Sequence, residues 1–273
     1  MSPRTAVTGL QFVKLGGSLI TDKTRAYTAE QEVIARLAEE VRYALDADPD
    51  LSLLLGHGSG SFGHWAAQPY GTERGVATPE EWRGYAEVAA AAARLNRIVT
   101  DIFLDAGVPV LSLQPSASLR CHDREVVDLD VRPIRQALHH GLVPLVYGDV
   151  ALDDVRGGTI ASTEDLFVYL TEALQPVRIL LLSRVPGVLD EDGEVIPCIT
   201  PNSFAHWRRV FSGSRGVDVT GGMADKVARM VELVHGQPGT RVRILTGARP
   251  GLVSRVLLGA EQNVGTLIVS EDD

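Results

Sequence analysis

The chain has 273 residues, of which 45% are hydrophobic and 22% charged, and its formal net charge is −9 at pH 7. A chain of this length and balance can bury the core of one large α/β domain or of two small ones. Nucleic-acid-binding proteins usually show clustered Lys and Arg, and the sequence has no such run, so the acidic balance is interpreted as a solvated surface that binds no nucleic acid.

Strand and helix signals alternate along the chain, which predicts a mainly parallel sheet with helices on its faces. In chain order the expected elements are a strand over 12–15, a helix over 28–47, a strand over 51–55, a helix over 79–106, strands over 108–113 and 143–147, a helix starting at 162–165, a strand over 178–182, a helix over 220–234, and strands over 242–245 and 266–269. Thr28 with Gln31, and Thr78 with Glu81, have the spacing of a capping box at a helix start.

Three turns combine glycines with a lysine, a histidine or a hydroxyl. They are 14–18 (Lys-Leu-Gly-Gly-Ser), 56–64 (Gly-His-Gly-Ser-Gly-Ser-Phe-Gly-His) and 218–226 (Asp-Val-Thr-Gly-Gly-Met-Ala-Asp-Lys). Glycine lets the backbone approach a ligand closely, and successive N–H groups at a helix start form an anion site. The turns therefore predict a site for a polyphosphate.

The use of lysine supports this interpretation. Of the 26 basic residues only Lys14, Lys23 and Lys226 are lysines, and Lys14 and Lys226 lie in these turns. Because the sequence uses Arg elsewhere, the compact charge of these three side chains indicates a function that a planar guanidinium does not provide.

Other phosphate-binding patterns are absent or in poor context. The sequence contains neither the Gly-Lys dipeptide of a P-loop nor the Asp-Phe-Gly of protein kinases. Gly58, Gly60 and Gly63 match the dinucleotide fingerprint formally, but Pro69 soon interrupts any helix and no acidic residue closes a second strand.

The cysteines and the apolar runs bear on location. Cys121 and Cys198 lie far apart and in no metal-ligand spacing, which favours a reducing compartment over a disulfide framework. Residues 1–5 lack the apolar stretch of a signal peptide, and runs such as 179–182 are too short to span a bilayer. The sequence predicts a cytoplasmic protein without membrane contact, and no metal held by side chains.

The motifs resemble those of the amino-acid kinase superfamily and, within it, the isopentenyl phosphate kinases. The similarity lies in 14–23, 57–64, 147–149, 218–226 and 264–266 and extends over nearly the whole chain. His64 is the most discriminating residue, because superfamily members that act on carboxylates or carbamate do not usually carry a histidine there.

The resemblance implies a three-layer α-β-α sandwich with a central mainly parallel sheet, in a single domain over 1–273. It places acceptor binding roughly in 1–175 and nucleotide binding roughly in 176–273. It implies a homodimer that transfers the γ-phosphoryl of ATP to isopentenyl phosphate with Mg²⁺, giving isopentenyl diphosphate and ADP for isoprenoid biosynthesis. The alternatives are a fosfomycin or phosphonate kinase of the same superfamily, or a non-catalytic nucleotide-binding sensor.

The resemblance also implies site residues. The catalytic residues are expected to be Lys14, Lys23, His64 and Lys226. Those expected at the acceptor are Gly58, Ser59, Gly60, His64, Gly148 and Asp149. Those expected at the nucleotide are Lys14, Gly16, Gly17, Ser18, Gly60, Glu164, Asp165, Asp218, Gly221, Gly222 and Lys226.

Several positions leave alternatives open. Ser59 replaces a usual glycine, and Arg184 replaces a usual Asp. The stretch 162–165 reads Ser-Thr-Glu-Asp instead of Ser-Gly-Asp-Asp, so either Glu164 or Asp165 could organise the lysines. Asp149 could orient lysines or only form a turn. His57 could bind the acceptor or lie in the core.

Overall fold

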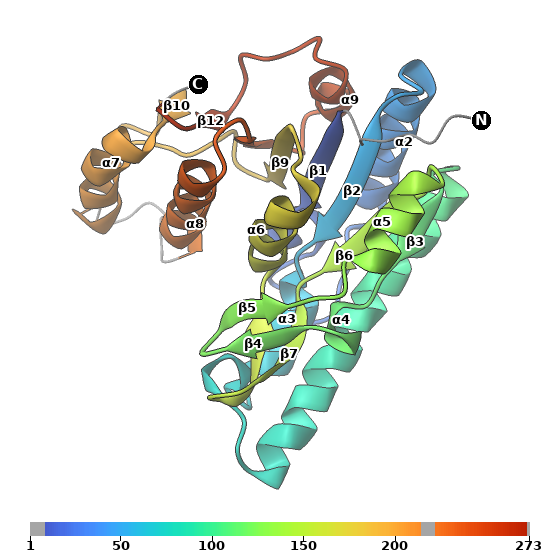
Figure 1. Ribbon diagram of the computed structural model, residues 1–273, viewed down its shortest axis with the longest axis vertical. Helices are drawn as coiled ribbons and strands as arrows, with labels where there is room; N and C mark the ends of the chain where they lie inside the picture. The colour runs from blue at the N-terminus through green and yellow to red at the C-terminus, as the bar shows by residue number, and fades with distance from the viewer. Residues whose placement is uncertain (1–8, 214–221, 272–273) are drawn as a thin grey trace.

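The computed structural model describes residues 9–213 and 222–271. Figure 1 shows one large sheet with helices packed on both of its faces, and a smaller sheet that extends from one end of it.

The larger sheet is formed by eight strands: β1 (Leu10–Leu15), β2 (Ser52–His57), β3 (Val110–Ser112), β6 (Val143–Tyr147), β9 (Arg178–Ser183), β10 (Cys198–Ile199), β11 (Arg241–Thr246) and β12 (Thr266–Ile268). Their spatial order is β10-β12-β11-β9-β1-β2-β6-β3. Neighbouring strands are parallel except β11 and β12, which are antiparallel. The carboxyl ends of the central strands therefore share one edge, where open α/β sheets usually bind ligands.

The helices are α1 (Gly17–Ile20), α2 (Gln31–Ala47), α3 (Gly60–Ala67), η1 (Thr72–Arg74), α4 (Pro79–Asp105), η2 (Pro115–Ala117), α5 (Arg132–His139), α6 (Thr163–Leu174), α7 (Pro201–Gly213), α8 (Gly222–Gly236) and α9 (Leu252–Leu257). Side chains alternate across β1: Val13 and Leu15 join the core with α2, α4 and α9, whereas Leu10 and Phe12 join the core with α5, α6 and α8. These two cores make three layers, which confirms the expected α-β-α sandwich.

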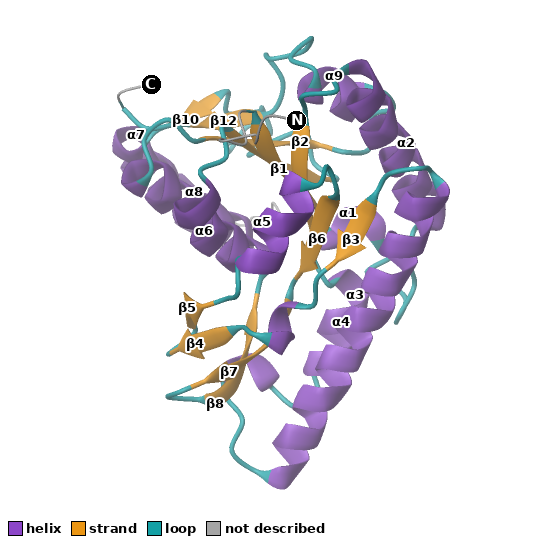
Figure 2. Ribbon diagram, turned by 45° about the vertical axis from the view of Figure 1, so that its right-hand side comes forward, coloured by secondary structure: helices purple, strands orange, loops and turns teal. Residues whose placement is uncertain are grey.

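A smaller sheet, not among the elements expected from the sequence, lies beyond the carboxyl edge of the larger one (Figure 2). Its strands are, in spatial order, β5 (Glu125–Asp128), β4 (Arg120–His122), β7 (Asp149–Asp153) and β8 (Gly157–Ala161). Only Gly148 separates β6 from β7, and only Ser162 separates β8 from α6. The smaller sheet therefore places the start of α6 at the carboxyl edge of the larger sheet.

The helix starts test the capping predictions. Thr78 and Glu81 form the expected capping box at the start of α4. The cap expected at Thr28 is wrong: α2 begins at Gln31, and the Thr28 hydroxyl donates to the carbonyl of Ala26. An isolated bridge between Thr21 and Ala29 accounts for the difference, because it holds the chain extended where the helix was expected to begin.

The expected division near residue 175 falls between α6 and β9. The strands before it (β1, β2, β3 and β6) form one half of the larger sheet and those after it (β9, β10, β11 and β12) form the other, and the two halves join where β9 pairs with β1. The larger sheet is therefore continuous across the division, and the smaller sheet lies wholly before it. Within the described ranges, no helix has both the length and the apolar character needed to cross a membrane.

Candidate active site

Lys14 and Lys226 meet at one carboxylate on the carboxyl edge of the larger sheet. Lys14, near the end of β1, is buried, and its ammonium forms an ion pair with Glu164 in the first turn of α6. Lys226, near the start of α8, places its Nζ 3.5 Å from the other carboxylate oxygen of Glu164. Two of the expected catalytic lysines are thus joined by Glu164, although they come from opposite ends of the chain.

The charges of this cluster support one another. Burial alone would raise the pKa of Glu164, but the ammonium groups of Lys14 and Lys226 outweigh it and lower the pKa to about 2. Burial lowers the pKa of Lys14, and the Glu164 carboxylate opposes that shift. Glu164 is therefore ionised at neutral pH and holds two positive groups close together, as a polyanion site requires.

This pKa shift predicts a pH-dependent contribution to stability. Glu164 is ionised above the pKa of about 4.3 that a glutamate has in an unfolded chain, so its stabilising effect is complete there and is lost as the pH falls toward 2. Glu164→Gln should lower the free energy of unfolding at pH 7 by on the order of 3 kcal/mol. The difference in the free energy of unfolding between this variant and the unsubstituted protein should become smaller below pH 4.5. Urea unfolding at a series of pH values would measure it. The exposed Glu191→Gln is the control, and a gap that does not change with pH would contradict the prediction.

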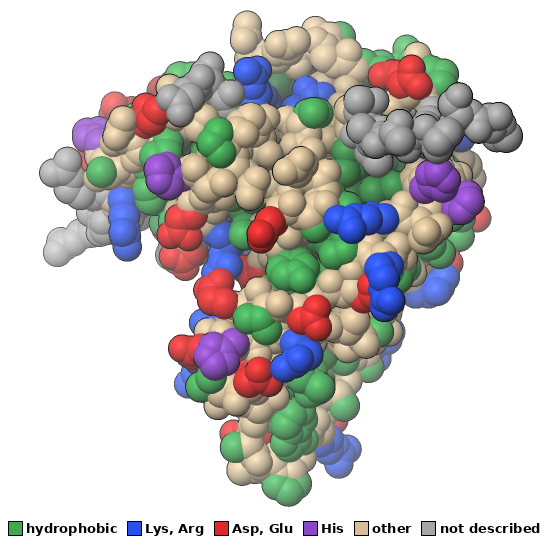
Figure 3. All heavy atoms as spheres, in the orientation of Figure 1, with side chains coloured by type: hydrophobic (Ala, Val, Ile, Leu, Met, Phe, Trp, Pro, Cys, Tyr) green, Lys and Arg blue, Asp and Glu red, His purple; other side chains and the backbone are tan. Residues whose placement is uncertain are grey.

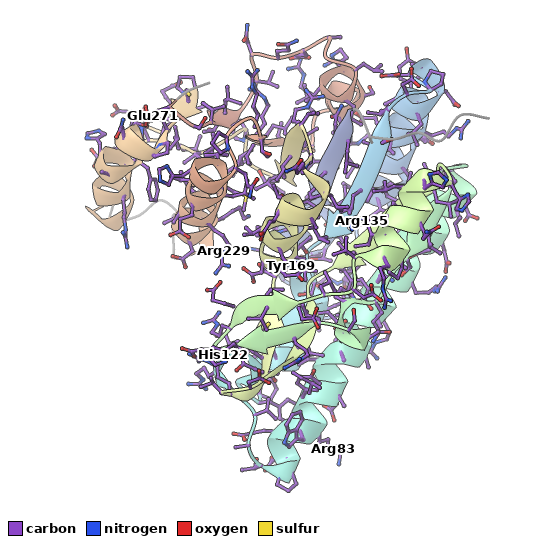
Figure 4. The ribbon with its side chains drawn as sticks, viewed as in Figure 1. Arg83, His122, Arg135, Tyr169, Arg229 and Glu271 are labelled. Atoms are coloured by element: carbon purple, nitrogen blue, oxygen red, sulfur yellow. The ribbon has the colours of Figure 1, made fainter. Side chains whose placement is uncertain are left out.

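Asp165 has a different environment from Glu164. Its carboxylate accepts the N–H of Ser162 at 2.7 Å, which completes a capping box at the start of α6. It also pairs with Arg229 of α8, whose Nη1 lies 2.6 Å away. Figure 4 labels Arg229 between α8 and the smaller sheet. Of the two candidates from the sequence, Glu164 is therefore the one that contacts the lysines.

The first two glycine turns pack directly against each other. A Cβ on Gly17 would lie 2.6 Å from the backbone nitrogen of Gly60, and one on Gly58 would lie 3.0 Å from the nitrogen of Gly17. Thr21 links the turns, because its hydroxyl donates to the Gly17 carbonyl at 2.6 Å and accepts the Ser61 N–H at 2.9 Å. The glycines are needed here for close approach of the two backbones.

Ser59 adopts backbone angles that any residue can take. Its φ of −72° and ψ of −13° lie in the right-handed helical region, where it precedes the first residue of α3. The departure from glycine thus causes no backbone strain. At the start of α3 the N–H of Ser61 donates to Thr21 and that of Phe62 to the Ser59 carbonyl, whereas no hydrogen bond of the Ser59 or Gly60 N–H is found in the described part of the chain. Beside them, the buried hydroxyl of Ser61 has no hydrogen-bond partner among the residues that the structure describes. The N–H groups of Ser59 and Gly60 and the Ser61 hydroxyl are therefore available to an anion.

His64 and Lys23 are both exposed to solvent. His64 lies in α3, one turn after Gly60, and Lys23 lies in the loop between α1 and α2. Arg184 steadies that loop: it donates to the carbonyl of Ser18 and its Nη2 lies 3.0 Å from Glu30. Neither side chain takes part in the Lys14–Glu164–Lys226 cluster among the described residues.

Asp149 and Gly148 lie where the larger sheet continues into the smaller one. Asp149 is buried, and its carboxylate accepts the N–H groups of Ser116 and Val150 at 3.1 and 2.9 Å. Burial raises its pKa. The N–H of Gly148 donates to the carbonyl of His57 at 3.1 Å. These contacts fix the junction of the two sheets, and no contact between Asp149 and a lysine is found in the described part of the chain.

A cavity of about 580 Å³ opens beside the lysine cluster, lined by residues that include Glu164, Asp165, Lys226 and Arg229. It lies between α8 and the smaller sheet, where Figure 3 shows acidic side chains around a hollow in the surface. Among the described residues, no group of His, Cys, Asp or Glu has the arrangement of a metal site. The cavity gives a ligand access to Lys226 and Glu164.

Of the residues expected at the nucleotide, two cannot be placed and a third is placed only by its backbone. Asp218 and Gly221 lie outside the described residues, and Gly222 is the first residue of α8. The structure therefore brings together Lys14, Lys226 and Glu164, and beside them the turns at 16–18 and 58–60.

Sequence reasoning missed Thr21 and Arg229. Thr21 lies inside the motif 14–23, but its role depends on contact with a turn that is distant in sequence. Arg229 follows Lys226 by three positions on α8, so the helical period would have placed both on one face of that helix.

The model of the amino acid kinase family matches residues 9–246. The isopentenyl phosphate kinase of Methanocaldococcus jannaschii is 35% identical over 225 residues, which cover 80% of this chain and 85% of that protein. The isopentenyl phosphate kinase of Haloferax volcanii is 37% identical over 252 residues, which cover 90% and 98%. An X-ray structure of isopentenyl phosphate kinase superposes with a TM-score of 0.80 at 32% identity and covers 95% of this chain and 100% of that one.

Proposed function

The chain belongs to the amino acid kinase family and, within it, to the isopentenyl phosphate kinases, and on this premise we propose that it transfers the γ-phosphoryl of ATP to isopentenyl phosphate. The products are isopentenyl diphosphate and ADP. The observation that carries the proposal is the pairing of Lys14 and Lys226 through Glu164, beside the glycine turn that leads to His64.

The reaction needs positioning and charge neutralisation rather than covalent catalysis. Phosphoryl transfer passes through a transition state whose charge is spread over oxygen atoms, and the acceptor here is itself an anion. Lys14 and Lys226 are suited to hold the β- and γ-phosphates, because Glu164 fixes both ammonium groups at one point. Lys23 stabilises the phosphoryl group in transit, and His64 donates to the phosphate of the acceptor.

The nucleotide enters as its magnesium complex in this proposal. Glu164 is engaged by two lysines, and Asp165 by Arg229 and the helix cap, so the nucleotide phosphates would supply most of the ligands of a Mg²⁺ ion, which would neutralise part of their charge. The acidic lining of the cavity favours a nucleotide whose negative charge the metal has reduced. We also propose that the protein acts as a homodimer, as the family resemblance implies.

Measurement of ADP release tests the proposal. The protein is supplied with Mg-ATP and, in turn, with isopentenyl phosphate, dimethylallyl phosphate, fosfomycin, glutamate or carbamate. We expect the highest kcat/KM with isopentenyl phosphate. Turnover of fosfomycin alone would keep the fold and the lysine cluster but replace the acceptor, and ATP binding without turnover of any acceptor would favour a sensor.

A further inference from the structure

A buried histidine lies directly behind the second glycine turn. His57 ends β2, has no exposed surface, and stacks on Tyr147 at the end of β6 with ring centroids 5.4 Å apart and planes inclined by 8°. Its Nδ1 lies 3.1 Å from the carbonyl oxygen of Gly58, and its Nε2 lies 3.3 Å from Oδ1 of Asn96 in α4. The chemistry proposed above does not use this ring.

The backbone of His57 is fixed as firmly as its ring. Its carbonyl accepts the N–H of Gly148 at 3.1 Å and the hydroxyl of Thr163 at 2.7 Å. The ring is therefore held against α4 and the backbone against the start of α6. A side chain fixed on both sides can set the orientation of the group that it contacts next, which is the carbonyl of Gly58.

That carbonyl belongs to the same peptide unit as the N–H of Ser59. The unit is trans, so its C=O and N–H groups point in opposite directions. Since the ring of His57 holds the carbonyl toward the core, the N–H of Ser59 points away from the core. Gly58 lies beside Lys14, since a Cβ on Gly58 would lie 3.8 Å from Cε of Lys14.

We propose that His57 is a positioning residue, which orients the Gly58–Ser59 peptide so that the N–H of Ser59 faces the phosphate groups bound at the turn. The inference rests on the proposed function, because it assumes that phosphate groups bind there. It gives His57 a role that acts through the backbone and requires no contact with substrate.

The protonation of the ring follows from the same contacts. A carbonyl can only accept, so Nδ1 must carry a proton. Burial lowers the pKa of His57 to about 4, so the ring is neutral at pH 7 and Nε2 accepts. The structure places Oδ1 of Asn96 toward Nε2. A half-turn of the amide exchanges its oxygen and its NH₂ group, and the NH₂ group then donates to Nε2 and supports this tautomer. In the structure Nδ2 of Asn96 lies 2.5 Å from Ser112 Oγ and donates to it, and after the half-turn the Ser112 hydroxyl donates to the amide oxygen instead.

Two substitutions of similar size separate positioning from packing. In His57→Asn the side-chain amide nitrogen can occupy the place of Nδ1, whereas in His57→Gln it reaches nearer the place of Nε2. Both variants lose the stacking on Tyr147, so both should have lowered unfolding midpoints. We expect His57→Gln to lower kcat/KM for isopentenyl phosphate about tenfold, and His57→Asn to stay within about threefold of the unsubstituted protein. Equal losses, or a greater loss in His57→Asn, would overturn the proposal.

A second readout does not depend on turnover. The amide resonance of Ser59 should shift on addition of inorganic phosphate in the unsubstituted protein and in His57→Asn, and this shift should be much reduced in His57→Gln. The same pair of substitutions at the exposed His139 controls for general effects. If phosphate shifts Ser59 as expected while isopentenyl phosphate is not turned over, the proposed function fails and the positioning role stands. If turnover is normal and phosphate shifts Ser59 equally in all variants, the positioning role is wrong.

Discussion

Replacing Lys14 with methionine is expected to lower kcat by about 100- to 1000-fold, the loss typical of removing a preorganised charge from a phosphoryl or oxyanion site. Methionine keeps most of the aliphatic length of lysine and removes the ammonium group that pairs with Glu164. Lys14 is buried near the end of β1, so the methionine side chain would stay within the packed site. Steady-state ADP release at saturating Mg-ATP and isopentenyl phosphate measures the effect.

The same substitution leaves Glu164 with Lys226 as its remaining lysine partner, which would cost up to about 3 kcal/mol of stability. The double variant Lys14→Met with Glu164→Gln distinguishes this cost from catalysis. We expect it to regain part of the free energy of unfolding and none of the rate. Recovery of the rate in the double variant would mean that Lys14 serves only to neutralise Glu164.

His64→Ala is expected to lower kcat/KM for isopentenyl phosphate by about 10- to 100-fold, through loss of a hydrogen bond to a charged phosphate. The KM for ATP should change little, since the lysine cluster binds the nucleotide in the proposed mechanism. His64 is exposed on α3, so the free energy of unfolding should stay within about 0.5 kcal/mol. The measurement is a pair of kinetic titrations, one for each substrate.

Two further variants sharpen that experiment. His64→Gln keeps a donor and should recover part of the lost kcat/KM. His122→Ala removes an exposed histidine from β4 of the smaller sheet, labelled in Figure 4, and should behave as the unsubstituted protein. An equal rise in the KM values of ATP and isopentenyl phosphate in His64→Ala would count against a specific role at the acceptor.

The strands of the larger sheet other than β10, and the importance of Lys14 and Lys226, could be predicted from the sequence because their signals are local. Apolar runs such as 51–55 predict buried strands. The glycines beside Lys14 predict a turn at which the backbone can approach a phosphate closely. The smaller sheet gave no such signal, since its strands are short and partly exposed. It depends on Asp153, whose carboxylate accepts N–H groups from Asp123 and Arg124 in another hairpin.

The choice between Glu164 and Asp165 could not be made from sequence for a related reason. Both carboxylates lie in the first turn of α6, and either could have faced Lys14. The structure separates them because the capping box and Arg229 occupy Asp165. Arg229 belongs to α8, which lies far from α6 in the sequence. Its ion pair with Asp165 is therefore a tertiary contact, and the sequence around 162–165 gives no sign of it.

The place of β1 inside the larger sheet has a consequence for how the protein is made. Gln11 of β1 pairs with Arg178 of β9, and the two residues are 167 positions apart. During synthesis the first strand therefore keeps one open hydrogen-bonding edge until most of the chain has left the ribosome. Open edges of apolar strands are the sites at which nascent chains associate with one another. A fragment that ends near residue 175 would contain both Lys14 and Glu164, yet it would expose this edge, so its solubility would depend on a strand that it lacks.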